Sequence, residues 1–256
     1  MSKLPKAHKF IDISDYGRPA ARYIALSLKE TRFTPIHVTI AFVISGLIGA
    51  VCIIYGQFWL AAFFLIFKSI LDAADGELAR IKNTPSYTGR YLDSVADIIL
   101  NAIFLVAIGY ISNAHIWAIC AAFIGIQLQG TLYNYYYVIL RNKFNGDTTS
   151  RVFEYETPTA LKGEKQSHVN FLFSLYKLLY GSFDKIIYTL DKKASEGEPI
   201  PKWLMTAIST FGLGFQLLLI AIFLVLGLKD FIIPFFIGYS GMIFVFIAIR
   251  KLCDNI

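Results

Sequence analysis

Charged residues are scarce in this sequence. Lys, Arg, Asp and Glu make up only 16% of its 256 residues, whereas an average soluble domain carries about 25%. Hydrophobic residues reach 56%, with 22 phenylalanines among them, and the mean hydropathy is +0.56. A water-soluble globule cannot hide this much apolar surface, and a disordered chain needs a far more polar composition. The composition therefore indicates a polytopic membrane protein.

Cysteine and histidine are also few, at three and four residues. Cys52, Cys120 and Cys253 have no paired spacing, so we interpret them as small hydrophobic residues rather than as disulfides or metal ligands. The first 33 residues carry seven Lys and Arg and lack the unbroken apolar core of a signal peptide. These absences argue against a disulfide scaffold, a zinc site and a cleaved leader.

Apolar runs of spanning length, which is about 20 residues, recur along the chain. Thr34 and Pro35 supply a helix N-cap and a first helical residue for the earliest run. Short uncharged turns at 55–58 and 112–115 predict two antiparallel hairpins. We predict an all-α integral membrane protein with six transmembrane helices preceded by an interfacial amphipathic N-terminal helix. The six helices are expected at 34–55, 58–80, 90–112, 115–140, 204–228 and 231–250.

Two amphipathic segments lie outside these runs. Residues 10–31 mix apolar and basic side chains, which is typical of a helix lying in the membrane interface. In 168–192 the apolar residues recur at steps of three and four, which predicts a helix on the membrane surface or against another domain. The predicted organisation is an interfacial segment 1–33, four spans in 34–140, a cytoplasmic connection 141–203, and two spans with a tail in 204–256.

The basic residues mark one side of the membrane. Lys and Arg (24) exceed Asp and Glu (18), which gives a net charge of +6. All of the basic residues fall on or beside the side of both termini, except Lys68 within a span and Lys229 in an opposite turn. That side is expected to be cytoplasmic, in the inner membrane if the source is bacterial. The same placement explains Arg141 and Arg250 without a substrate role, and we expect no nucleic-acid partner.

Four aspartates stand out, because an ionisable group within a span costs about 2.5–3.5 kcal/mol and is a functional candidate. Asp72 and Asp75 lie one turn apart near the end of the second run, and Asp93 and Asp97 lie four apart near the start of the third. A short turn joins the two helices, so the pairs can face each other. Converging carboxylates must take up protons or cations, and oxygen-only ligands favour Mg²⁺ or Mn²⁺.

Small and basic residues accompany these aspartates. Arg80 is placed to bind a phosphate or to pair with Glu77 or an aspartate, and Lys68 to pair with Asp72 or meet an anionic substrate. The small residues leave room for a ligand, although tight helix packing also uses such residues. They are Ala73, Ala74, Gly76 and Ala79.

The spacing of this hairpin resembles the CDP-alcohol phosphotransferase (CDP-alcohol phosphatidyltransferase) family. The family pattern is Asp-x2-Asp-Gly-x2-Ala-Arg-x8-Gly-x3-Asp-x3-Asp, and every fixed position is matched. The resemblance extends over about residues 15–250, although the segment 141–203 is longer than in compact bacterial members. The matching residues are Asp72, Asp75, Gly76, Ala79, Arg80, Gly89, Asp93 and Asp97.

The resemblance implies an enzyme that moves a substituted phosphate from a CDP-alcohol to a hydroxyl acceptor and releases CMP, in phospholipid biosynthesis. It implies that Asp97 is the general base. The CDP moiety would contact Gly76, Ala79, Arg80 and Gly89. Two divalent ions, Mg²⁺ or Mn²⁺, would be held by Asp72, Asp75, Asp93 and Asp97.

Substrates and assembly follow less directly from the resemblance. At least one substrate is expected to be a lipid or lipid precursor. Residues 15–22 before Thr34 are similar to the first helix of members that use inositol phosphate, and CDP-diacylglycerol is a further candidate donor. The family implies a homodimer among membrane lipids, and Gly212, Gly214 and Gly227 offer small residues for packing.

Two other functions fit an acidic cluster within membrane helices. An intramembrane prenyltransferase also binds Mg-diphosphate through aspartates, but it needs a second aspartate cluster that residues 204–250 lack. A divalent cation transporter favours acidic residues near mid-membrane on several helices, whereas these gather on one hairpin. Both remain alternatives to the phosphotransferase.

Overall fold

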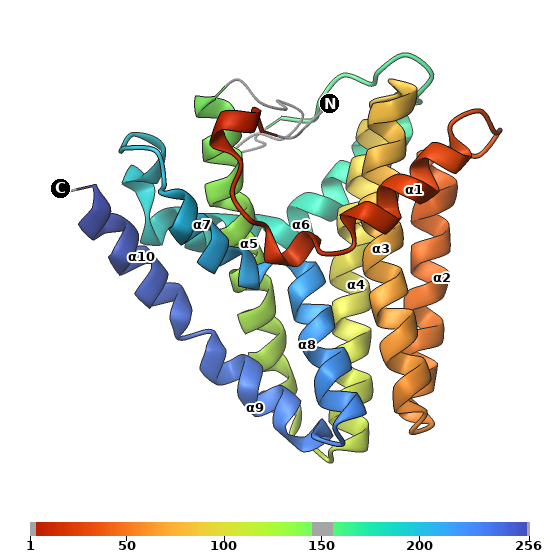
Figure 1. Ribbon diagram of the computed structural model, residues 1–256, viewed down its shortest axis with the longest axis vertical. Helices are drawn as coiled ribbons and strands as arrows, with labels where there is room; N and C mark the ends of the chain where they lie inside the picture. The colour runs from red at the N-terminus through yellow and green to blue at the C-terminus, as the bar shows by residue number, and fades with distance from the viewer. Residues whose placement is uncertain (1–3, 145–155, 255–256) are drawn as a thin grey trace.

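The computed structural model describes residues 4–144 and 156–254, and every regular element in these ranges is helical (Figure 1). The prediction of an all-α chain is thus confirmed for the described residues. The α-helices are α1 (Arg18–Leu28), α2 (Pro35–Ile54), α3 (Phe58–Lys82), α4 (Tyr87–Ile111), α5 (Ile116–Lys143), α6 (Gln166–Leu190), α7 (Lys202–Ile208), α8 (Leu213–Val225), α9 (Lys229–Tyr239) and α10 (Met242–Cys253). Short 3-10 turns include η2 (Ile13–Asp15) and η4 (Ser209–Phe211).

Four helical stretches among the described residues are long and apolar enough to cross a membrane. They are α2, α4, α5 and the stretch Lys229–Cys253, which contains α9 and α10. The pair formed by Lys202–Phe211 and Leu213–Val225 would be a fifth, if its two bent parts are one span. The predicted count of six also includes α3, which carries Lys68, Asp72 and Asp75 in its middle. Four to five spans are therefore supported, and six stays a prediction.

The continuous helix expected at 204–228 is wrong, because the chain bends by 53° between η4 and α8. Gly212 is extended at the bend (φ −69°, ψ 146°). A Cβ atom on Gly212 or Gly214 would clash with Ser14 of η2. The backbone N–H of Ile13 also donates to Ser209 Oγ at 2.9 Å. The N-terminal segment thus packs into the bend, so these two glycines serve a contact within the chain rather than the contact between copies that we expected.

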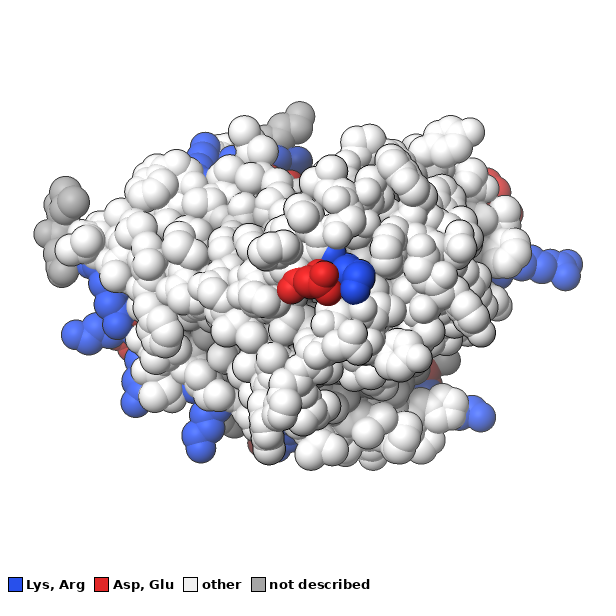
Figure 2. Space-filling view, turned by 90° about the horizontal axis from the view of Figure 1, so that it is seen from below, with Lys and Arg blue, Asp and Glu red and all other residues white. Residues whose placement is uncertain are grey.

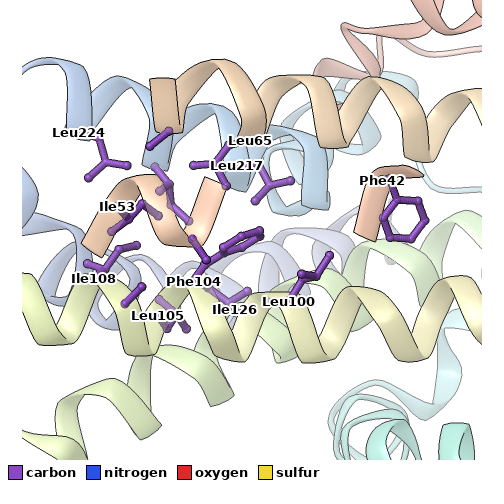
Figure 3. Packing of buried hydrophobic residues seen from close by; sticks show 14 of the residues in the cluster. Phe42, Ile53, Leu65, Leu100, Phe104, Leu105, Ile108, Ile126, Leu217 and Leu224 are labelled. Carbon is purple, nitrogen blue, oxygen red and sulfur yellow. The ribbon is translucent and has the colours of Figure 1, made fainter. Parts of the chain in front are cut away.

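The main core lies where α2, α3, α4 and α8 meet, and Figure 3 shows part of it. Phe42, Leu65, Phe104 and Leu217 are among its fully buried side chains. Small residues bring the helices close, because a Cβ on Gly46 would lie 2.8 Å from Leu100 Cδ1. Close packing of this kind holds helices together in a lipid environment, where apolar burial alone gives little advantage. This core supports the inner faces of α3 and α4, which carry the aspartates.

The two ends of the bundle differ in charge. Figure 2 shows the end at the bottom of Figure 1. The middle of this face is uncharged apart from one acidic and basic pair, and the other charged residues in view lie at the rim. Short turns at this end connect α2 to α3, α4 to α5 and α8 to α9 (Figure 1). Among the described residues at this end, Lys229 and Asp230 form an ion pair at 3.2 Å. The asymmetry agrees with the sequence analysis, although which end faces the cytoplasm stays a prediction.

The connection after α5 returns to the bundle as α6, which packs against α4 and α5. Val169 and Phe173 of α6 are buried beside Tyr91 of α4. Farther along, the hydroxyl of Tyr180 donates to the backbone carbonyl of Ser94 at 3.0 Å. The helix therefore lies along the part of α4 that carries Asp93 and Asp97.

Candidate functional site

The turn between α3 and α4 is fixed by its polar residues. Asn83 ends α3 in the left-handed region (φ 51°), which Asn tolerates better than most residues. Ser86 caps α4 by accepting from the N–H of Gly89 at 2.8 Å. Glu164 accepts from the Ser86 hydroxyl and the Thr88 N–H, both at 2.7 Å. These contacts hold the end of α3 and the start of α4 side by side.

Glu164 belongs to the long connection and lies outside the membrane-length helices. Burial raises the pKa of its carboxyl group, but the hydrogen bonds from Thr88 and Ser86 outweigh this effect. Its pKa therefore lies below the ordinary value, and the charged form is the one that stabilises the start of α4. The sequence pattern gave no indication of this contact, because the two segments are far apart along the chain.

Three of the four aspartates lie together. Asp72 and Asp75 of α3 and Asp93 of α4 each offer a carboxylate oxygen, and these oxygens lie within 4.8 Å of one another. Thr39 of α2 donates to Asp75 Oδ2 at 2.6 Å. In contrast, Asp93 Oδ1 is buried and has no hydrogen-bond partner. We call these three residues the carboxylate triad.

The fourth aspartate has a different partner. Asp97 accepts a short hydrogen bond from Nζ of Lys68, which also donates to Asp72 Oδ2 at 3.1 Å. The pairing of Lys68 with Asp72 that the spacing indicates is confirmed. The contact across the hairpin to Asp97 was not expected, because sequence spacing fixes neighbours on one helix but not the facing residues of two.

The residues proposed for the nucleotide lie on the same hairpin. A Cβ atom on Gly76 would be 3.5 Å from Arg80 Nη1, so the guanidinium lies over this glycine. Arg80 Nη2 donates to Glu77 Oε2 at 2.7 Å, as the sequence analysis considered, while its Nε is buried without a hydrogen-bond partner. Ala79 lies on α3 one residue before Arg80, and Gly89 is in the first turn of α4. Each of these positions therefore adjoins the turn beside the carboxylate triad.

Other helices supply residues that the sequence analysis missed. Thr39 comes from α2, and Arg18 of α1 reaches Glu77 with 3.4 Å between Nη1 and Oε2. Thr39 has no distinguishing pattern in its apolar helix. Arg18 lies in the segment 15–22 whose similarity was noted, but its partner 59 residues away was not predictable.

Two buried polar groups lie outside the hairpin, and the first tests the sequence analysis. Arg250 was interpreted as a residue at a helix edge, yet it is 3% exposed and its Nη2 donates to Asp191 Oδ1 at 2.7 Å. That interpretation is incomplete, because a buried charge requires a partner. Gln129 donates to Ser240 Oγ at 3.0 Å and accepts from Gln216 Nε2 at 3.1 Å. Polar residues within membrane-length helices commonly hydrogen-bond to other helices in this way.

The carboxylate triad fits a hard divalent cation. Its donors are all carboxylate oxygens, which are the ligands that Mg²⁺ and Mn²⁺ prefer. The unpartnered Asp93 Oδ1 leaves an acceptor open inside the protein, where an unmet carboxylate is costly. Asp97 would have to break its ion pair with Lys68 before it could bind a metal ion together with the triad.

The described residues define a helical protein with membrane-length segments and a carboxylate cluster on one hairpin, which is a class suited to binding divalent cations. The sequence model of the CDP-alcohol phosphatidyltransferase family matches residues 32–182, more than half of the chain. The protein belongs to this family. A search of curated proteins finds no match.

Membership establishes the reaction class. The chain is a transferase of the phosphotransferase type, which uses a CDP-alcohol donor and an alcohol acceptor in phospholipid synthesis. The family uses divalent metal ions, with which the carboxylate triad is compatible. The match covers α2 to α5 and much of α6, so the described hairpin lies wholly within it.

Proposed function

We propose that the hairpin of α3 and α4 is the active site, where a substituted phosphate passes from a CDP-alcohol to a lipid-related hydroxyl acceptor. One observation carries this proposal: three carboxylate oxygens within 4.8 Å of one another lie on the family's matched segment, and one acceptor beside them is unpartnered. Asp72, Asp75 and Asp93, with Asp97, would hold two Mg²⁺ or Mn²⁺ ions. Such ions, when bound, neutralise the diphosphate and stabilise the attacking and leaving oxygens.

The chain's own residues then position the substrates. Gly76, Ala79, Arg80 and Gly89 line the CDP site in this proposal, since small residues leave room beside the turn. The Arg80 guanidinium offers N–H donors for a phosphate, and its unpartnered Nε supports this role. Glu77 keeps the guanidinium in place through the hydrogen bond at 2.7 Å.

Asp97 is proposed as the general base. A hydroxyl group is a weak nucleophile, so a carboxylate within hydrogen-bond reach must take its proton as it attacks. Asp97 lies next to the triad on α4, and its side chain is 16% exposed, so an acceptor can approach it. Lys68 holds the carboxylate in position on the side of α3.

The acceptor is proposed to be inositol phosphate or a related polar alcohol, with CDP-diacylglycerol as the donor. Support comes from the segment 15–22, because Arg18 lies beside Glu77 at the edge of the motif. A lipid chain could remain among the apolar helices while the nucleotide stays near the charged end. We also propose that this end faces the cytoplasm and that the enzyme is a homodimer.

The test is CMP release by purified protein in detergent with Mg²⁺ or Mn²⁺. Donors should include CDP-diacylglycerol, CDP-choline, CDP-ethanolamine and CDP-inositol, each with inositol phosphate, glycerol phosphate or serine where an acceptor is needed. We expect CMP release with CDP-diacylglycerol and inositol phosphate, and mass spectrometry should identify the lipid product. Release from another donor alone would refute this choice of substrates, and release from none would refute the function.

Two variants separate chemistry from folding in this assay. Asp97→Asn should lower CMP release by about 100-fold or more, because the base is lost while the shape is kept. Asp230→Asn is the matched control, because this acidic residue is 62% exposed at the opposite end of the bundle. Equal activity of the two variants would remove Asp97 from the role of base.

A further inference from the structure

Lys68 is a buried cation inside the acidic site. It lies on α3 one turn before Asp72 and is only 1% exposed. Its Nζ contacts Asp72 on its own helix and Asp97 on α4. The same Nζ lies 4.6 Å from the centre of the Phe42 ring on α2. Three helices therefore surround one ammonium group.

These contacts show that the Lys68 ammonium group belongs to the acidic site. A buried charge is tolerated only when it is paired, and here two carboxylates and an aromatic face supply the pairing. Lys carries three N–H donors on a compact point charge. It can thus occupy the space between two carboxylates that a metal ion would otherwise bridge.

The four aspartates are divided by this contact. Asp72, Asp75 and Asp93 form the carboxylate triad, while Asp97 is outside it and is held by Lys68. A divalent ion at the triad fits this division. A second ion bound between Asp72 and Asp97 would have to displace the ammonium from both carboxylates, or lie beside it against like-charge repulsion.

We propose that Lys68 is a built-in cation that takes the place of one of the two divalent ions while substrate is absent. The inference rests on the proposed function, because it assigns the aspartates to metal binding. The substrate-free protein then binds one divalent ion tightly at the triad. The second ion binds well only when the diphosphate of the donor brings further negative charge to the site. Lys68 is thus a positioning residue that acts through Asp97.

Mn²⁺ binding to the purified full chain in detergent, without any nucleotide, tests this inference. Free Mn²⁺ can be counted by electron paramagnetic resonance during a titration. We expect one tightly bound Mn²⁺ ion per chain for the natural protein and for Lys68→Arg, which keeps the positive charge. Lys68→Met should gain a second equivalent, with an affinity at least about tenfold higher than that of any second site in the natural protein. Two tight equivalents in the natural protein, or no gain in Lys68→Met, would overturn the inference.

Asp97→Asn provides a second test that does not depend on removing the lysine. In Asp97→Asn, we expect the affinity for the one tightly bound Mn²⁺ ion to stay within about threefold of that of the natural protein. In Asp93→Asn, we expect this affinity to fall by about tenfold or more. A tenfold loss in Asp97→Asn would place Asp97 at the first ion and overturn the inference. CMP release by the same preparation separates the two proposals: active protein with two tight ions refutes only the role of Lys68. Protein that neither binds Mn²⁺ nor releases CMP refutes the proposed function as well.

Discussion

Two groups of buried charged side chains among the described residues differ in what they leave unpaired. In the first, Asp191 at the end of α6 accepts from Arg250 of α10 at 2.7 Å and from the Tyr136 hydroxyl at 2.6 Å. Each of its carboxylate oxygens therefore has a partner. Arg250 also pairs with Asp254, one turn along its own helix. Arg250 Nε lies 2.5 Å from Asp191 Oδ2 as an ion pair but makes no hydrogen bond. Both carboxylate oxygens of Asp191 are thus met within the protein, and we call this group closed.

The second group is the α3 and α4 hairpin, and it is not closed. Lys68 pairs with Asp72 and Asp97, but Asp93 Oδ1 is buried without a partner. An unmet buried carboxylate is expensive unless it takes up a proton or something outside the chain meets it. From this comparison we expect the closed group to serve stability and the open group, as proposed, to serve binding.

The largest expected effect is on activity at the open group. Asp93→Asn should lower CMP release by about 1,000-fold, because a proposed ligand of the divalent ion is lost. The thermal midpoint in detergent should stay the same or rise, since one unmet charge has gone. A variant that keeps activity within about tenfold, or that unfolds, would break the comparison.

The opposite result is expected at the closed group. Asp191→Asn should lower the free energy of unfolding by up to about 3–5 kcal/mol, because Arg250 loses its buried carboxylate partner and keeps only Asp254. Activity per folded molecule should change little. The double variant Asp191→Leu with Arg250→Met should recover much of the thermal stability. If Asp191→Asn lost activity but not stability, the closed group would not be structural.

An uncharged buried group provides a smaller effect. Gln129, Gln216 and Ser240 join α5 and α8 to the junction of α9 and α10 through hydrogen bonds. Gln216→Leu should lower the free energy of unfolding by about 0.6–1.7 kcal/mol, the range for hydrogen bonds between membrane helices. Urea or thermal unfolding in detergent measures this. A loss as large as that of Asp191→Asn would show that charge is not what separates the groups.

The smallest effect is expected at Glu164, whose carboxylate is paired but partly exposed. Hydrogen bonds from Thr88 and Ser86 hold its pKa below the ordinary value in the folded chain. Its contribution to stability is therefore present above the pKa of the unfolded chain and is lost as the pH falls through the folded pKa. Glu164→Gln should cost less than about 1 kcal/mol at pH 7 and should remove this pH dependence. Hydrogen exchange of the Thr88 and Gly89 amides at pH 7 and pH 4 measures it. Faster exchange in Glu164→Gln only at pH 4 would contradict the assignment.

Much of the first half of the fold could be predicted from the sequence. The expected spans 34–55 and 58–80 correspond to α2 and α3, because long apolar runs and the Thr34–Pro35 start are local signals. The region 202–225 was less predictable. Its break at Gly212 depends on Ser14, which is nearly 200 residues away along the chain, and no local pattern encodes that contact.

The candidate site shows the same limit at the level of single residues. The helical spacing of the aspartates predicted that both pairs share a hairpin, and the triad is consistent with this. The spacing did not predict that Asp97 pairs with Lys68 or that Thr39 donates to Asp75. Those contacts depend on the packing of α2, α3 and α4, which only the three-dimensional structure specifies.

The nearly uncharged end of the bundle has a consequence for how the protein is made. Short turns join α2 to α3, α4 to α5 and α8 to α9 at this end, so the chain can enter the membrane as helical hairpins. At the end shown in Figure 2, the Lys229–Asp230 pair has no net charge. Moving an unpaired Lys or Asp to the centre of a bilayer costs about 2.5–3.5 kcal/mol on insertion scales. The hairpins therefore need to carry little charge across the bilayer during biosynthesis. With the charged end facing the cytoplasm, as proposed, the aspartates of the α3 and α4 hairpin would stay on the side where the chain is synthesised.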